Sequence, residues 1–433
     1  MGEKKLHEPI NFENSIEFSK RLDDLDPLKD FRNYFLIPQY NGKEQIYFLG
    51  NSLGLPSKNI KDEINKILDQ WANYGVEGFF MGEAPWINYH DQLIKPLSKI
   101  VGALPLEITV MNQLTVNLHL MMVSFYQPKA KRNKILCEAK AFPSDQYMFE
   151  THIRNHGLNP DEIIIEVEPY KGEYLIRTED ILGAINKHKD ELALVLFSGV
   201  NYYTGQVFDI KTITEAAHNI GAMAGFDLAH AAGNIPLQLH NWNIDFACWC
   251  SYKYLNSGPG AVGGVYIHEK FHHDKNIKRF GGWWGYNKET RFKMEKSFKP
   301  VPTAEGWQLS TPSLLLYASH KAALEIFEEA GWENLQAKQK LLNNYLWFIL
   351  EEINKSSFQK KIVFITPQRE EERGCQVSML MLEGGKEIFD DLTKKGVMAD
   401  WRELDVIRIA PVPLYNTFEE VWRFGNIIKD ILS

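Results

Sequence analysis

Short apolar runs alternate with longer amphipathic stretches from about residue 91 to residue 268. Several of these runs are continuously apolar, which is typical of strands buried on both faces of a sheet. Stretches with helical periodicity lie between most of them, so the pattern predicts an α/β fold with a mainly parallel, seven-stranded sheet. The seven predicted strands cover residues 108–111, 134–138, 163–167, 192–198, 222–227, 244–250 and 263–268.

The pattern changes after Ser310-Thr311-Pro312, where two long helical stretches follow each other at about 313–330 and 332–354. Shorter elements complete the chain, and together they predict a smaller α+β domain. They are the strands IVFIT, QVSMLML and VIRIA, a helix near 385–395 and a closing helix at 416–432.

The N-terminal segment is charged, with a predicted helix around residues 18–28 and a short strand, IYFL, at 46–49. We expect this segment to pack with the smaller domain. The predicted division is residues 1–50 for the N-terminal segment, 51–311 for the large domain and 312–433 for the small α+β domain.

Composition narrows the class of protein. The chain has 433 residues, 44% of them hydrophobic and 24% charged, which is ordinary for a soluble globular protein. A net charge of -8 argues against a nucleic-acid surface. No apolar run is long enough to span a bilayer, and the first residues, MGEKKLHEPINFEN, lack the apolar core of a signal peptide. We therefore expect a cytoplasmic protein without a membrane partner.

Four cysteines in a chain of this length imply no disulfide framework. Cys248 and Cys250 flank Trp249 inside an apolar run, so a buried, reduced strand is expected there rather than a metal site. Cys137 and Cys375 also fall on strand-like runs. No metal is predicted.

The main chemical signal is an acid and a lysine at the ends of two buried runs. Asp227 ends AMAGFD, and Tyr252-Lys253 follows IDFACWC. Pyridoxal phosphate needs a lysine for its aldehyde and a carboxylate against its pyridine nitrogen. The alternatives are a lysine that extends to solvent and an aspartate that caps the following turn. His230 lies close in sequence and could orient Asp227, although a lone histidine is more often structural.

Other candidates follow strand ends, where ligands of open parallel sheets bind. Thr115 opens a helix that could offer amides to a phosphate, or could be a simply capped core helix. Phe142 could stack on a ring, with Ser144 and Asp145 near its polar edge. Arg408, inside an apolar strand, needs a partner, either a substrate carboxylate or a buried acid.

Long segments resemble kynureninase, a family of aspartate-aminotransferase-like (fold type I) pyridoxal-phosphate enzymes, over nearly the whole chain. They include FLGNSLGLPSK, MNQLTVNLHLM, FPSDQY, FSGVNYYTGQ, GFDLAHAAGN, DFACWCSYKYLNSGPG, TRFKM and RIAPVPLYNTF. The resemblance implies that Lys253 binds the cofactor, Asp227 pairs with its ring nitrogen and Phe142 stacks on it. The rest of the implied cofactor pocket is Leu114, Thr115, Pro143, Ser144, Asp145, Ser198, His230 and Tyr252.

The resemblance also implies a homodimer, because Trp283 and Thr311 match positions that the family supplies from the partner subunit. Arg408 is expected to hold the substrate's α-carboxylate, and Asn51 and Ser52 of FLGNSLG are expected to contact the substrate. Catalysis is assigned to Lys253, Tyr252 and Asp227, which also belong to the implied cofactor pocket.

The implied reaction is hydrolysis of L-kynurenine, 3-hydroxy-L-kynurenine or both to L-alanine and anthranilate or 3-hydroxyanthranilate. This reaction belongs to tryptophan catabolism and NAD biosynthesis. Val76 and Thr311 stand where some animal members of the family carry histidine and asparagine. Both differences remove polar groups that could meet a ring hydroxyl, which favours L-kynurenine.

Rival functions come from the same fold and from another class. A cysteine desulfurase would place histidine, not Tyr252, before the lysine and would need a mobile cysteine. A small-amino-acid aminotransferase is the other sister enzyme. A non-catalytic scaffold would be expected to have lost Lys253 or Asp227, and both are present. A nicotinamide dehydrogenase is disfavoured because no strand runs into a G-x-G-x-x-G turn.

Overall fold

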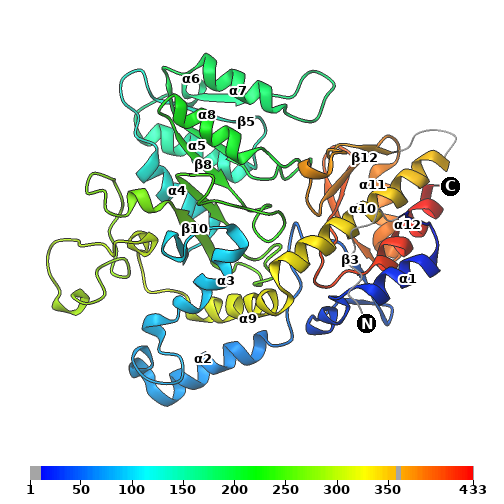
Figure 1. Ribbon diagram of the computed structural model, residues 1–433, viewed down its shortest axis with the longest axis horizontal. Coiled ribbons are helices and arrows are strands. Elements are labelled where there is room, and N and C mark those ends of the chain that lie inside the picture. The colour runs from blue at the N-terminus through cyan, green and yellow to red at the C-terminus, as the bar shows by residue number, and fades with distance from the viewer. Residues whose placement is uncertain (1–10, 357–361, 433) are drawn as a thin grey trace.

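A computed structural model describes residues 11–356 and 362–432 of the chain. Residues 1–10, which begin the predicted N-terminal segment, lie outside the described residues. The described part folds around two separate sheets, a large one and a small one, with helix α10 (Trp332–Ser356) running toward the small sheet (Figure 1). Within that part, none of the helices is long and apolar enough to cross a membrane.

The large sheet has seven strands in the order β4-β10-β9-β8-β7-β5-β6. β10 is antiparallel to both of its neighbours, and the other neighbouring strands run parallel. This confirms the predicted mainly parallel, seven-stranded α/β sheet. The strands are β4 (Ile108–Met111), β5 (Lys134–Glu138), β6 (Ile164–Val167), β7 (Leu192–Ser198), β8 (Met223–Asp227), β9 (Phe246–Trp249) and β10 (Gly263–Ile267).

The sheet is buried on both faces, as its continuously apolar strands predict. In β7, Val195 and Phe197 pack into one hydrophobic cluster, whereas Leu194 and Leu196 pack into another on the opposite face. The first cluster includes side chains of α3 (Asp91–Val101), α7 (Thr178–Lys187) and α8 (Ile210–Asn219). The second includes side chains of α4 (Leu114–Phe125) and α5 (Pro143–Asn155), with α6 (Pro160–Ile163) beside them.

The small sheet has the order β11-β12-β15-β14, with all neighbours antiparallel. Its strands are β11 (Ile362–Phe364), β12 (Val377–Met381), β15 (Val406–Ile409) and β14 (Asp400–Arg402). Helices α10, α11 (Gly385–Lys394) and α12 (Phe418–Leu432) supply apolar side chains to the hydrophobic cluster around this sheet. Strand β13 (Val397–Met398) pairs in parallel with β3 (Ile46–Tyr47) near the N-terminal end.

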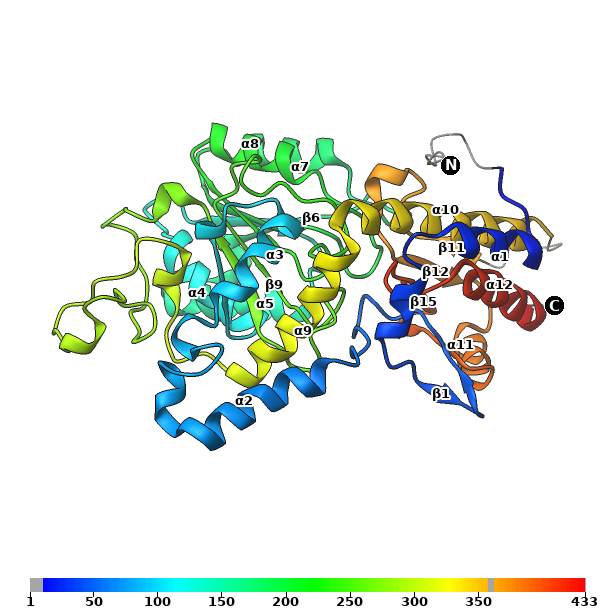
Figure 2. The same ribbon diagram turned by 60° about the horizontal axis from the view of Figure 1, so that its bottom comes forward.

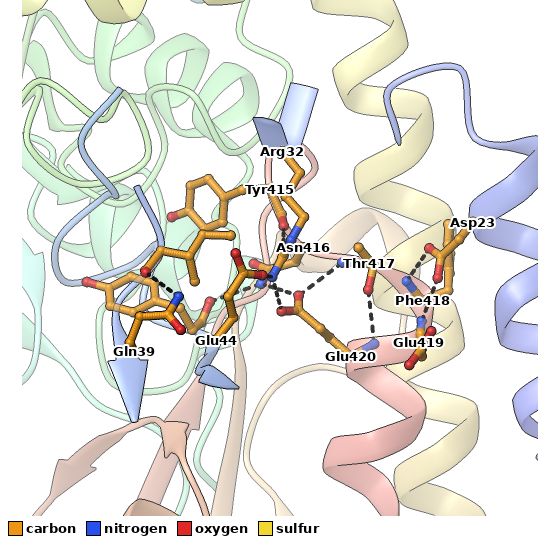
Figure 3. A network of polar contacts seen from close by, with 12 residues as sticks. Asp23, Arg32, Gln39, Glu44, Tyr415, Asn416, Thr417, Phe418, Glu419 and Glu420 are labelled. Atoms are coloured by element: carbon orange, nitrogen blue, oxygen red, sulfur yellow. Dashed lines mark hydrogen bonds and ion pairs between the residues drawn. The ribbon is translucent and has the colours of Figure 1, made fainter. Parts of the chain in front are cut away.

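The N-terminal segment lies against the small sheet's helices, with α1 (Ile16–Leu25) beside α12 (Figure 2). Figure 3 shows the polar contacts of this seam between the N-terminal segment and α12. The Asp23 carboxylate accepts hydrogen bonds from the backbone N–H groups of Phe418 and Glu419, at 2.7 and 2.9 Å, and so caps α12. Arg32 lies 2.9 Å from both Glu44 and Glu420.

One long helix of the predicted small domain packs with the large sheet. Helix α9 (Leu314–Ala330) contacts α2 (Ile60–Tyr74) and α3, and Tyr317, Leu324 and Phe327 belong to the large sheet's cluster (Figure 2). The division at residues 50 and 311 stays a prediction. The packing shows that α10, rather than α9, leads from one hydrophobic cluster to the other.

Candidate functional site

A cavity of about 200 Å³ opens beyond the carboxyl ends of β5, β7 and β8, where parallel sheets bind their ligands. Most of the predicted cofactor residues line it: Leu114, Thr115, Phe142, Ser144, Asp145, Ser198, Asp227, His230, Tyr252 and Lys253. Five further lining residues were not predicted, namely Gln113, Glu138, Val200, Tyr202 and Ala229.

Lys253 is buried and points toward His230, with 3.0 Å between Lys253 Nζ and His230 Nε2. Burial lowers the pKa of His230 well below its usual range, and the charge of Lys253 lowers it further. The imidazole is therefore neutral near pH 7, and its Nε2 accepts a hydrogen bond from the ammonium group. His230 holds the lysine without competing with it for a proton.

The loop before α2, which contains Gly54, packs against the backbone of Tyr252 and Lys253. The N–H of Gly54 donates to the carbonyl of Tyr252 at 2.8 Å. A Cβ atom at Gly54 would lie 2.4 Å from the carbonyl oxygen of Lys253, so only glycine allows this approach. The fold thus brings the GNSLG motif against Lys253, although the two lie far apart in the sequence.

Asp227 faces a second carboxylate. Its Oδ1 accepts a hydrogen bond from the N–H of Ala229 at 2.7 Å, so the predicted local capping and a site at the cavity coexist. Its side chain also lies within hydrogen-bonding reach of Asp145, and burial raises the pKa of both groups. Two carboxylates in contact cannot both ionise easily, so the pair shares a proton. Lys253 lowers the pKa of both acids and favours one negative charge on the pair.

Glu138, which we did not predict, is a third buried acid in this cavity. Both of its carboxylate oxygens accept from the N–H of Ser198, each at 3.1 Å. Burial raises the pKa of Glu138 to about 7, and Asp227 adds to the shift. The signal that could have identified it was present in KILCE, where an acid ends an apolar strand as Asp227 does.

The remaining lining residues offer an aromatic face and free polar groups. The exposed Phe142 ring meets the unpredicted Tyr202 edge-on, with ring centroids 5.1 Å apart. Ser198 Oγ and His230 Nδ1 are buried without a hydrogen-bond partner among the described residues. Thr115 lies in the first turn of α4, whose N-terminal end receives no capping bond from any side chain described.

These observations fit pyridoxal phosphate. Lys253 can hold the aldehyde, Asp227 can face the ring nitrogen, and Phe142 can cover the ring. The uncapped start of α4 presents N–H groups to a phosphate, with Thr115 beside them. The buried, unpartnered Ser198 hydroxyl and His230 ring nitrogen are donors or acceptors that a bound polar group would satisfy.

Arg408 lies on β15, buried near the cavity but not lining it. Its Nη2 contacts Asp400, and its Nη1 donates to the carbonyl of Tyr202. The buried salt bridge that we considered as an alternative is therefore present. Nε has no hydrogen-bond partner among residues 11–356 and 362–432, and the guanidinium lies 5.9 Å from the centroid of the Tyr202 ring. An arginine has five N–H groups, so donors remain for a second carboxylate.

Other predicted residues lie away from the cavity lining. Trp283 and Thr311 line a separate, open hollow. Asn51 is buried, and its Nδ2 donates to Gln376 Oε1 at 3.0 Å. Ser52 follows Asn51 in the same loop. Pro143 is the first residue of α5, next to Phe142. The side chain of Val76 is 73% exposed.

Sequence comparisons find relatives that match nearly the whole length of this chain. The kynureninase C-terminal domain family matches residues 335–428, and the class-V aminotransferase family matches residues 159–379. A kynureninase from Flavobacterium psychrophilum is 56% identical over 96% of this chain and 98% of its own. Kynureninases from Myxococcus xanthus and Nematostella vectensis are 47% and 45% identical, over 97% and 96% of this chain and 98% and 93% of their own.

Solved structures show the same fold at low sequence identity. A cysteine desulfurase from Thermococcus onnurineus superposes with a TM-score of 0.72 at 16% identity, covering 89% of this chain and 94% of its own. A variant of C-DES with glycine covalently linked to its PLP cofactor gives 0.73 at 17% identity, covering 89% and 96%. These likenesses establish the fold type I architecture.

Proposed function

The chain belongs to the kynureninase family, and on that premise we propose that it hydrolyses L-kynurenine to anthranilate and L-alanine at the cavity around Lys253. The reaction depends on pyridoxal phosphate and places the protein in tryptophan catabolism, with a further role in NAD biosynthesis. One observation carries the assignment of the site: the buried Lys253 lines the same cavity as the buried carboxylates of Asp145 and Asp227, which lie in contact.

Lys253 and Asp227 perform the first steps in this proposal. Bound pyridoxal phosphate withdraws electrons from the carbon atoms next to the substrate's amino group. Lys253 Nζ, once released by the substrate's amine, takes the proton from the α-carbon. Neutral His230 holds Nζ in place for this transfer, since its Nε2 lies 3.0 Å away. Asp227 keeps a negative charge against the ring nitrogen, and Asp145 holds the proton that the pair shares.

The bond between Cβ and Cγ breaks after water adds to the substrate's γ-carbonyl. The carboxyl group of anthranilate receives the oxygen of this water. The alanine fragment receives a proton at Cβ, and Lys253 returns a proton to Cα before L-alanine leaves. Tyr252 is the proposed donor of that proton. Burial raises the pKa of its phenol, so the group is protonated at neutral pH and can donate.

Arg408 orients the substrate in this proposal by binding its α-carboxylate. Asp400 and the carbonyl of Tyr202 fix two of its nitrogens, which leaves a rigid guanidinium with free N–H groups. Asn51 and Ser52 are proposed to contact the substrate from the loop that supports Lys253.

We further propose a cytoplasmic homodimer in which Trp283 and Thr311 complete the partner's cavity. Two features support the dimer. Both residues line an open hollow that shares no residue with the cavity around Lys253. Large apolar side chains are also exposed in the segment 280–311 that carries Trp283 and Thr311, including Phe280, Phe292 and Met294.

The assay for the function is anthranilate fluorescence after protein loaded with pyridoxal phosphate is mixed with L-kynurenine. Anthranilate and alanine should appear in equal amounts. Protein that binds the cofactor but releases no anthranilate would contradict the proposal and point to a sister enzyme of the fold. We expect L-kynurenine to have the higher kcat/KM, and a ratio favouring 3-hydroxy-L-kynurenine would contradict the interpretation of Val76 and Thr311.

A further inference from the structure

Glu138 has no part in the proposed mechanism, although it lines the cavity and is only 2% exposed. It ends β5, and its carboxylate reaches across to the end of β7. Both oxygens accept from one backbone donor, the N–H of Ser198, at 3.1 Å. Glu138 makes no salt bridge to any cation in the described part of the chain, so burying its carboxylate destabilises the fold. Such groups are found mostly at functional sites, which suggests a role for Glu138 in this cavity.

The end of β7 that Glu138 holds is the part that pairs with Asp227. Ser198 lies opposite Asp227 in the register of β7 and β8. The next residue, Gly199, donates its N–H to the carbonyl of Asp227 at 2.7 Å. Glu138 therefore fixes a segment that carries both the Ser198 hydroxyl and the backbone contact to Asp227.

The charges around Glu138 are mostly negative. Asp227 on β8 and Asp145 on α5 are the nearby acids, and Lys253 is the cation of the cavity. Cys137 precedes Glu138 on β5, and burial raises the pKa of its thiol so that it stays neutral. His230 is neutral as well, because burial lowers its pKa. Among the acids, Glu138 has its pKa raised to about 7, so it gains and loses its proton in the neutral range.

We propose that Glu138 is a positioning residue of the cofactor site, which holds Ser198 and Asp227 in place and changes the electrostatic potential at Asp227 when it gains or loses a proton. The inference rests on the proposed function because it requires that the cavity bind pyridoxal phosphate. Glu138 acts through its neighbours and needs no contact with the cofactor.

The direction of the effect follows from the charges. Below neutral pH the Glu138 carboxyl is protonated and adds no charge. Above neutral pH its anion stabilises a proton on the cofactor ring nitrogen opposite Asp227. Wild-type affinity for pyridoxal phosphate should therefore contain a rise with a midpoint near pH 7, the pKa of Glu138.

Glu138→Gln separates the two parts of the role. The glutamine amide oxygen can still accept from Ser198, so the fold and the strand ends are kept, but the side chain cannot ionise. We expect its affinity for pyridoxal phosphate to match the wild type at pH 6 and to be about tenfold weaker at pH 8.5, the effect of about one pKa unit on the ring nitrogen. Glu138→Asp should lose affinity at both pH values because the shorter side chain cannot reach Ser198.

The measurement is equilibrium binding of pyridoxal phosphate to apoprotein between pH 5.5 and 9, followed by tryptophan fluorescence and by the absorbance of the lysine-bound cofactor. Glu166→Gln is the matched control. It makes the same change on β6, opposite Cys137, at an exposed position outside the cavity. The control should reproduce the wild-type curve.

A Glu138→Gln curve that keeps the wild-type transition near pH 7 would overturn the inference while leaving cofactor binding and the proposed function intact. A wild-type curve without that transition would overturn it as well. Wild-type apoprotein that failed to bind pyridoxal phosphate would instead refute the proposed function, and this inference with it.

Discussion

Two regions of this molecule that hold buried acids, the seam and the cavity, neutralise them in opposite ways. In the seam between the N-terminal segment and the small sheet's helices, Asp26 lies 2.7 Å from Lys338, and Glu420 lies 2.9 Å from Arg32. In the cavity, Asp145, Asp227 and Glu138 lie near one another, and Lys253 acts as the cation for Asp145 and Asp227. Asp26 and Glu420 in the seam each lie against a cation, whereas the cavity crowds like charges and raises their pKa values.

The difference separates stability from chemistry. Removing one partner of a buried ion pair destabilises the fold, because the other charge is left uncompensated. Acids that raise one another's pKa destabilise the folded protein at neutral pH, and such groups gather where proton transfer is needed. The two lysines, Lys253 and Lys338, allow a direct test of this comparison because both are buried and each serves one region.

Lys253→Ala should have the largest effect of any single substitution in either region. We expect turnover to fall by at least about 10⁴-fold, because the amine both binds the cofactor and moves protons. The urea midpoint of unfolding should change little, since the cavity acids lose a partner but remain protonated in part. Steady-state release of anthranilate and urea unfolding of the same preparation measure both quantities. Retained turnover would remove Lys253 from the mechanism.

Lys338→Met should show the reverse pattern. The substitution keeps the length of the side chain but leaves Asp26 buried without its cation, at a cost of about 3 kcal/mol of unfolding free energy. The kcat of the folded enzyme should stay within about twofold, because Lys338 lies outside the cavity. The double variant Asp26→Asn, Lys338→Met is the control and should recover part of the loss. A single variant as stable as the wild type would contradict the structural role of the pair.

Asp227→Ala should weaken cofactor binding and turnover together. Without the carboxylate the ring nitrogen is no longer held protonated, and we expect kcat to fall by about 10²-fold or more. Equilibrium dialysis of pyridoxal phosphate and the rate at saturating cofactor separate the two losses. An unaltered rate at saturation would refute the role of Asp227 at the ring nitrogen.

The sequence was sufficient for those features that depend on local pattern. The seven apolar runs predicted every strand of the large sheet, and Lys253 and Asp227 stood out because each follows or ends such a run. Glu138 ends a run in the same way, but its partner, Ser198, is 60 residues away and binds through its backbone. Backbone donors leave no trace in residue type, so this contact was invisible in the sequence.

Two other features depend on tertiary packing in the same way. The acid that binds Arg408 is Asp400, its cross-strand partner in β14, and residue pattern alone does not specify the register of these strands. Helix α9 has the periodicity of the helices that follow it. It nevertheless packs against α2 and α3, on the side of the large sheet. Residue periodicity predicts that a segment is helical, but not which helices it contacts.

The smallest expected effect concerns Asp23, an acid of the seam whose pKa is raised, to about 6, chiefly because it is buried. Between its ordinary value of 3.8 and that value, the folded state binds more protons than the unfolded state. The stability of the wild type therefore decreases as pH rises through this range, and the cost is complete above about pH 6.

Asp23→Asn removes this titration but keeps a side-chain oxygen that can accept from the start of α12. Because the Asp23 side chain is only half-buried, we expect the wild type to lose only about 1 kcal/mol relative to the variant between pH 4 and 6.5. Urea unfolding at a series of pH values measures the difference between the two curves. A difference that did not change with pH would contradict the raised pKa of Asp23 and would show that burial in the seam does not disfavour its carboxylate.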